Sequence, residues 1–337
     1  MAEWAQIRDF MSAAAQRVAD LGLEFLSPDS RYFIGYLLVT LLIAAGLFLV
    51  ERSGQALTLR GFLAWALPKE VYSHHSVRVD IGLILFNQVF VPGVWIAEAL
   101  ALGRIDDWII DNGHAWLGGS LISGTPSTAV MLALGLLVFC AFDFAMYVHH
   151  WLGHKFPLLW EIHRVHHSAE HLTPFTADRF HPLEEIMKSL IVLPIVGLAV
   201  GLFSLVFDPS VVSHGFNMVK IWLFVRLFSM VGANLRHMHI WWSWPDAIAR
   251  IVSSPAQHQI HHSIEEKHYG KNLGSFFSLW DWMFGTLYQP TEREHIRFGV
   301  NEGQNHHSTA RTLWQPITGI WQVLRRPARS HNTQPAR

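Results

Sequence analysis

Long apolar stretches alternate with shorter polar segments along the first two thirds of the chain. Crossing a hydrocarbon core of about 30 Å requires roughly 20 mainly apolar residues, and four stretches meet this length, over residues 32–50, 81–102, 128–148 and 187–207. A fifth, over 211–235, carries His214, Lys220 and Arg226, so it is either the returning arm of a hairpin or an interfacial helix. The pattern predicts an all-α, multi-pass membrane protein with about four to five hydrophobic segments.

Composition agrees with this class. Apolar residues make up 51% of the 337 residues and charged residues only 15%, which is the membrane side of the usual range. The formal net charge of −1 gives no basic surface of the kind that binds nucleic acid. The first apolar stretch starts about thirty residues into the chain, and no small-residue cleavage site follows it, which indicates a retained span and not a signal peptide.

The distribution of basic residues predicts the orientation. The segment between the first two stretches carries Arg52, Arg60, Lys69 and Arg78, whereas the next polar segment has Arg104 among three aspartates. By the positive-inside rule the first segment is cytoplasmic. Counting spans from there places residues 149–186 and the last hundred residues on the same side. A bacterial inner membrane fits best, with the active site facing the cytoplasm.

Three clusters of histidines follow the third apolar stretch. They are His150-x3-His154, His163-x2-His166-His167 and His258-x2-His261-His262. On a helix, residues three and four positions apart share one face, with Cβ atoms about 5–6 Å apart. Each cluster can therefore direct two or three imidazoles at one point, and the predicted topology returns all three clusters to one membrane face.

Eight converging imidazoles are too many for one ion. They predict a dinuclear metal site that keeps positions open for an exogenous ligand. Imidazole suits zinc, copper, iron or nickel, and the spacing leaves these metals open. Cys140 is the single cysteine, so the ligands must offer nitrogen or oxygen.

The third apolar stretch adds two candidate residues. Asp143, Tyr147, His150 and His154 stand at i, i+4, i+7 and i+11, which forms one helical stripe. An ionisable group inside a span indicates function. We interpret Asp143 as an acceptor that orients a ligand imidazole, with a purely structural pairing as the alternative, and Tyr147 as a residue that lines the substrate approach.

Three isolated histidines near the predicted membrane surface could complete the site. In order of preference they are His237, His181 and His239. For each of them, a structural hydrogen-bonded histidine is nearly as good an interpretation.

Residues from about 140 to 290 resemble the fatty acid hydroxylase and sterol desaturase superfamily. The resemblance is carried by the three histidine clusters, by Asp143-Phe-Ala-Met-Tyr147, by the 176–184 segment, and by Asn272-Leu-Gly274 followed by residues 280–286. The chain departs from the family at two positions. Trp151 stands where arginine is common, and His239 stands where asparagine is common, which leaves open whether His237 or His239 is the further ligand.

The resemblance implies a helical membrane anchor topped by a cytoplasmic helical cap that holds two iron ions. The implied metal ligands are His150, His154, His163, His166, His167, His237, His258, His261 and His262. The implied reaction is hydroxylation, desaturation or ether cleavage of a lipid-like substrate, such as a sterol or a fatty acyl lipid, with dioxygen as co-substrate. The sequence has no flavin fingerprint, cysteine cluster or haem motif, so a separate ferredoxin, cytochrome or reductase is expected to supply electrons.

The expected organisation has three parts. Residues 1–127 form a membrane anchor with two spans, residues 128–290 form the catalytic domain, and residues 291–337 form a cytoplasmic C-terminal tail. Two other functions fit the same histidines: a di-zinc membrane hydrolase that activates water, and a non-catalytic metal-binding membrane protein.

Overall fold

The computed structural model describes residues 26–27, 30–52, 57–122, 127–207, 230, 233–300 and 308–325. This part of the chain is helical and contains no named strand, only two isolated β-bridges that join Ile122 to Phe207 and Ser263 to Phe298. The all-α prediction is therefore confirmed for the described residues.

Four long helices correspond to the four apolar stretches. They are α2 (Ile34–Glu51), α5 (His75–Leu117), α6 (Thr128–Lys155) and α8 (Pro182–Val206). Each is long and apolar enough to cross a membrane, in α5 over His75–Val94. Most of the fifth predicted segment, 211–235, and the end of the predicted tail, 326–337, lie outside the described residues.

Helix α5 differs from the prediction in length. A span over 81–102 followed by a polar loop was expected, but the helix is continuous for 43 residues, through Pro92, and ends where Gly118 adopts a left-handed φ of 77°. At 1.5 Å per residue it is about 65 Å long, roughly twice the thickness of a hydrocarbon core. The residues that follow Pro92 include alanine, leucine and glutamate, which favour helix, and α8 packs along α5.

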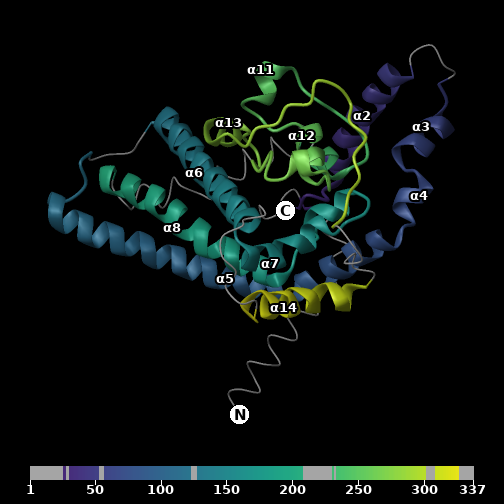
Figure 1. The fold of residues 1–337 in the computed structure, drawn as a ribbon. Coiled ribbons are helices and arrows are strands. Elements are labelled where there is room, and N and C mark those ends of the chain that lie inside the picture. The colour runs from purple at the N-terminus through teal and green to yellow at the C-terminus, as the bar shows by residue number, and fades with distance from the viewer. Residues whose placement is uncertain are drawn as a thin grey trace.

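Helix α8 packs against both α5 and α6. Against α6, Val196 and Val200 contact Met131, Leu134 and Val138 in a buried apolar cluster. Against α5, Gly201 allows close approach, because a Cβ atom there would lie 2.5 Å from the Ile109 side chain. Figure 1 shows the three helices extending together to one side of the molecule.

Shorter elements gather at the other end of these helices. They are α3 (Leu59–Ala66), α4 (Lys69–Tyr72), α7 (Pro157–His167), η2 (Pro174–Asp178), η3 (Ala233–His237), α11 (Asp246–Ala249), α12 (Pro255–His261), η4 (Glu266–His268), α13 (Leu279–Phe284) and α14 (Thr309–Arg325). Helix α7 follows α6 directly, and α14 packs on α7 and α5 (Figure 1). This end of the bundle contains the three histidine clusters.

Candidate metal centre

The first two clusters are brought together by a sharp junction between α6 and α7. His150 and His154 lie on the last turns of α6, both buried. Phe156 ends α6 and also precedes α7, whose first residue is Pro157. Proline is favoured at the first helical position, because its missing N–H would have no partner there. The chain therefore turns back at once, and α7 places its histidines against the end of α6.

The third cluster is held by a capped short helix. Ser254 and Gln257 form a capping box at the start of α12, with Ser254 N donating to Gln257 Oε1 at 2.8 Å and Gln257 N donating to Ser254 Oγ at 3.2 Å. Next to them, the Gln259 side chain donates to the carbonyls of Met238 and Ile240 at 2.9 and 2.8 Å. These bonds fix η3 beside α12, so His237 approaches the third cluster.

Nine histidines converge in two groups. The five-histidine group contains His150, His154, His163, His167 and His261, and the four-histidine group contains His166, His237, His258 and His262; within each group the candidate ligand atoms all lie within 4.8 Å of one another. Helix α7 contributes to both groups, because His163 and His167 share one face and His166 points elsewhere. The cluster that begins with His258 is divided in the same way.

The Nδ1 atoms of several histidines are already occupied by acceptors. Nδ1 of His150 lies 2.6 Å from Leu273 O, that of His166 lies 3.2 Å from Arg179 O, and that of His261 lies 2.9 Å from Lys271 O. A carbonyl oxygen can only accept, so each of these Nδ1 atoms carries the proton. The opposite ring nitrogen, Nε2, is then a bare lone pair.

The Nε2 atoms of the two groups lie close to one another. The Nε2 atoms of His261 and His167 are 3.1 Å apart, and those of His166 and His237 are 3.3 Å apart. Other Nε2 pairs in the two groups are separated by 2.9–3.2 Å. Nitrogens bound to one ion at about 2.0–2.1 Å lie about 3.3 Å apart in a tetrahedral site and about 2.9 Å apart in an octahedral site. The residues therefore fit two metal ions.

His163 has a carboxylate as its partner. Its Nδ1 atom donates to Glu184 Oε1 at 2.6 Å, and both side chains are buried. A carboxylate behind a ligand imidazole fixes the tautomer and increases the basicity of the ligating nitrogen. Sequence reasoning did not assign a role to Glu184, although the residue closes the 176–184 segment that carries part of the family resemblance.

A buried cation lies beside the four-histidine group. Arg236 Nη2 has Ser253 Oγ, Gly274 O and His258 Nδ1 within 3.1–3.2 Å. Arg236 Nη2 carries two hydrogens and cannot donate a separate one to each of the three partners. Its contact with His258 Nδ1 therefore does not fix the tautomer of His258. Burial, and after it the positive charge of Arg236, lowers the pKa of His258 well below its ordinary value.

A third group, His74, His75 and Glu170, has a different character. His74 Nδ1 accepts from Ser76 N at 3.3 Å, so its proton lies on Nε2, which faces Glu170 Oε2 at 3.6 Å. His75 Nε2 faces the same oxygen at 3.2 Å. The half-buried group is therefore an imidazole–carboxylate contact.

The two α6 residues predicted beside the histidines have other partners. Asp143 accepts from Phe276 N, Phe277 N and Trp280 Nε1 at 2.8, 3.0 and 2.8 Å. Among the described residues it thus fixes the 276–280 segment and does not hydrogen-bond a ligand imidazole. Tyr147 contacts Thr286 Oγ1 at 3.1 Å and stacks on Phe284.

Two of the three isolated histidines lie outside both groups. His181 accepts from Leu183 N at 3.1 Å at the start of α8, and its Nε2 atom contacts Leu313 O at 3.0 Å. His239 contacts Trp65 O at 2.8 Å. Of the pair His237 and His239, the structure brings only His237 into the four-histidine group.

A small cavity adjoins the five-histidine group. Its volume is about 60 Å³, and its walls include His154, His167 and His261, together with Trp160 and Tyr269. The histidines that line it all belong to the five-histidine group. This space admits molecules the size of water.

Acid is expected to destabilise the metal-free protein. Burial lowers the pKa of His166 to about 3, from an ordinary value of 6.5, and burial with nearby imidazoles lowers the pKa of His167 and His262 well below that value. Below pH 6.5 the unfolded chain binds protons that the folded chain excludes. The free energy of unfolding is therefore undiminished above pH 6.5 and decreases as the pH falls toward 3. The decrease is at most about 1.4 kcal/mol per pH unit for each histidine.

Thermal unfolding of chelator-treated protein in detergent, followed from about pH 8 to pH 5, tests this expectation. A midpoint that does not change over this range would contradict neutral buried imidazoles.

The chain is similar to proteins named as monooxygenases and desaturases. Residues 135–286 match the sequence profile of the family described as fatty acid hydroxylase. A putative methylsterol monooxygenase of Dictyostelium discoideum is 30% identical over 287 residues, covering 82% of this chain and 95% of that protein. No solved structure matches the chain.

Two further relatives share a shorter region. Human alkylglycerol monooxygenase is 24% identical over 186 residues, covering 54% of this chain and 36% of that protein. A Delta(7)-sterol 5(6)-desaturase of Gibberella zeae is 28% identical over 151 residues, covering 44% of this chain and 36% of that protein. The chain thus spans about a third of the length of each of these two relatives.

Proposed function

The chain belongs to the fatty acid hydroxylase family, and we propose that it is an integral-membrane oxidoreductase that oxidises a lipid with dioxygen at two iron ions. The observation that carries this proposal is the convergence of imidazole nitrogens in two groups. Four apolar helices place the chain in a membrane. The named relatives, a methylsterol monooxygenase, an alkylglycerol monooxygenase and a sterol desaturase, support a lipid as the substrate.

We propose iron because of the family. The histidines are compatible with iron, but they would bind other metals as well. Imidazole is a ligand for iron as well as for zinc and copper. We propose that His150, His154, His163, His167 and His261 hold one ion, and that His166, His237, His258 and His262 hold the other. The surrounding hydrogen bonds fix the orientation of the rings, so the ligands need little rearrangement when metal binds.

Bound iron would supply the activation of dioxygen and the attack on an unactivated carbon. The protein provides position and access. The cavity beside His154, His167 and His261 gives a small molecule access to the five-histidine group. Asp143 holds the 276–280 segment against α6, which places α13 next to Tyr147.

An apolar approach lies on the α13 side. Phe284 stacks on Tyr147, and Trp280 packs against Phe144 of α6. Trp282, Met283 and Phe284 are each more than half exposed. Apolar side chains exposed next to a membrane helix suit contact with lipid, so we propose that an acyl chain or sterol ring enters here.

We propose a bacterial inner membrane, with the metal centre on the cytoplasmic side. Basic residues Arg52, Arg60, Lys69 and Arg78 precede or begin α5, and Asp80 on the second turn of α5 contacts Arg179 near the histidine groups. The basic segment and the metal centre therefore lie at the same end of α5, and the positive-inside rule assigns this end to the cytoplasm. A separate ferredoxin, cytochrome or reductase would deliver the electrons.

The test is a lipid oxidation assay with the iron-loaded protein in bilayer nanodiscs. Membrane lipids, sterols and alkyl-ether lipids are each supplied with a ferredoxin–reductase mixture, under air and under argon. We expect oxidised product only with both dioxygen and reductant, and an oxygen-18 label from ¹⁸O₂ in any hydroxylated product. A product formed equally under argon would support the hydrolase alternative. Metal binding with no turnover of any lipid would support a non-catalytic protein.

A further inference from the structure

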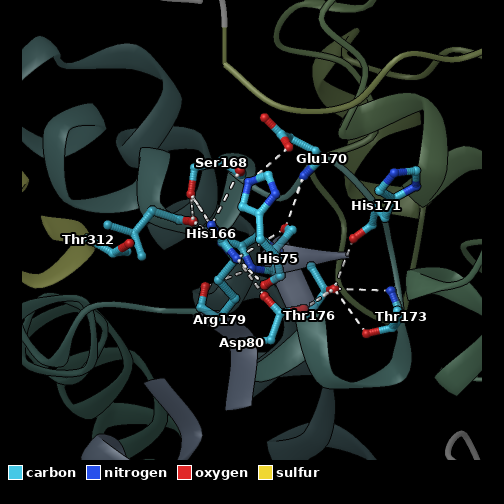
Figure 2. A network of polar contacts seen from close by, with 12 residues as sticks. His75, Asp80, His166, Ser168, Glu170, His171, Thr173, Thr176, Arg179 and Thr312 are labelled. Atoms are coloured by element: carbon cyan, nitrogen blue, oxygen red, sulfur yellow. Dashed lines mark hydrogen bonds and ion pairs between the residues drawn. The ribbon is translucent and has the colours of Figure 1, made fainter. Parts of the chain in front are cut away.

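A buried ion pair joins the start of α5 to the histidine-rich end of the molecule (Figure 2). Arg179 and Asp80 are both fully buried, and Arg179 Nη1 donates to Asp80 Oδ1 at 2.6 Å. The other oxygen of Asp80 accepts from Thr176 Oγ1 at 2.9 Å. Each charge is thus satisfied, as a buried ion pair requires if it is to be tolerated.

The same guanidinium caps the helix that carries the second histidine cluster. Helix α7 ends at His167, so its last carbonyls lack partners within the helix. Arg179 Nε donates to Val165 O at 3.1 Å. Its Nη2 atom donates to Ser168 Oγ at 2.9 Å (Figure 2). A cation at a helix C-terminus is also favoured by the helix dipole. The Arg179 side chain therefore fixes the end of α7.

The main chain of Arg179 contacts the four-histidine group directly. His166 Nδ1 donates to Arg179 O at 3.2 Å, while His166 Nε2 faces His237 Nε2 at 3.3 Å. The position of this carbonyl thus decides how the His166 ring is oriented. The side chain of the same residue holds the carbonyl in place through Asp80 and the end of α7.

We propose that Asp80 and Arg179 are positioning residues that hold His166 in the orientation required for metal binding by the four-histidine group. The inference rests on the metal centre proposed above. Asp80 belongs to α5 and lies outside the 135–286 segment that matches the family, so an anchor helix contributes to the geometry of the site. Without the Asp80 carboxylate, Arg179 is an uncompensated buried cation. Its guanidinium and carbonyl must then shift, and His166 with them.

Asn87 offers a matched control. It lies two turns further along α5, is 6% exposed, and its Nδ2 atom donates to Phe180 O at 3.0 Å. Asn87 therefore joins the same helix to the residue after Arg179, but through a carbonyl that His166 does not use. A purely structural role for Asp80 predicts that Asp80→Asn and Asn87→Ala affect metal binding alike.

The experiment is an anaerobic Fe²⁺ titration of the full chain in detergent, with Mössbauer spectra of iron-57 samples. We expect Asp80→Asn to weaken the binding of one ion about tenfold, within the range for lost outer-shell partners, and to leave the other unchanged. The affected ion should be the one whose signal disappears in His166→Ala. Asp80→Glu should restore the affinity, and Asn87→Ala should bind both ions as the unmodified protein does.

Three results would overturn the proposal. Unchanged affinity and spectra in Asp80→Asn would do so, as would an equal loss in Asn87→Ala. An unmodified protein that takes up no iron would overturn the metal centre itself, and this inference with it.

A second variant is used if Asp80→Asn does not fold. Ser168→Ala removes only the hydroxyl at the end of α7 and should still weaken the binding of the same ion. Unchanged iron binding in Ser168→Ala would then overturn the proposal.

Discussion

Replacing His166 and His167 together by alanine is expected to leave a protein that binds neither iron ion and oxidises no lipid. The two residues are adjacent in sequence but belong to different groups, His166 to the four-histidine group and His167 to the five-histidine group. One double variant therefore removes a ligand from each ion. The loss of activity should exceed about 100-fold, the upper end of what the loss of an outer-shell partner costs.

Elemental analysis and Mössbauer spectroscopy of an iron-57 sample are the measurements. The single variants separate the two groups, because His166→Ala should lose one ion and His167→Ala the other. His171→Ala is the control, since His171 follows the same helix and belongs to neither group. Two irons retained in the double variant would refute the ligand assignment. Two zincs and no iron in the unmodified protein, even after growth in iron-rich medium, would favour the hydrolase alternative.

Replacing Glu184 by glutamine is expected to lower iron affinity and activity about 10- to 100-fold. His163 Nδ1 donates to Glu184 Oε1 at 2.6 Å inside the protein. Glutamine can still accept this bond through its carbonyl oxygen, but it lacks the negative charge that makes the imidazole a stronger ligand. The effect should therefore appear in the five-histidine group, to which His163 belongs.

The neighbouring carboxylate is the control for this variant. Glu185 is also buried and lies on the same turn of α8, but it forms an ion pair with Lys188. Glu185→Gln removes the same charge one residue away from the histidine contact. Fe²⁺ titration should show an affinity loss in Glu184→Gln and little change in Glu185→Gln. Equal losses would mean that the total charge near the membrane surface matters more than the contact with His163.

The proposed site shows why a membrane helix outside the family match can matter for the chemistry. The His166 ring is held by a carbonyl, the carbonyl belongs to Arg179, and the Arg179 side chain is held by Asp80 of α5. Arg179 and Asp80 are fully buried and close-packed, so a displacement at Asp80 has few ways to relax before it reaches the ring.

The sequence by itself predicted the elements and the chemistry that depend on short spacing. The apolar stretches became α2, α5, α6 and α8, because the length of an apolar run is a local property. The histidine clusters predicted a dinuclear metal site, because imidazoles at helical spacing come close together whatever the rest of the fold does. The metal, the three-part domain division and the cytoplasmic cap stay predictions.

Only the tertiary structure decided how those pieces meet. It sorted nine histidines into groups of five and four, separated His237 from His239, and gave Asp143 partners in the 276–280 segment. It also supplied Glu184, the carbonyl of Arg179 and the carboxylate of Asp80, which is 99 positions away from Arg179 in the chain. These contacts come from helix packing and from chain reversals such as the one at Pro157. Such packing depends on side chains distant in sequence, and no local periodicity encodes it.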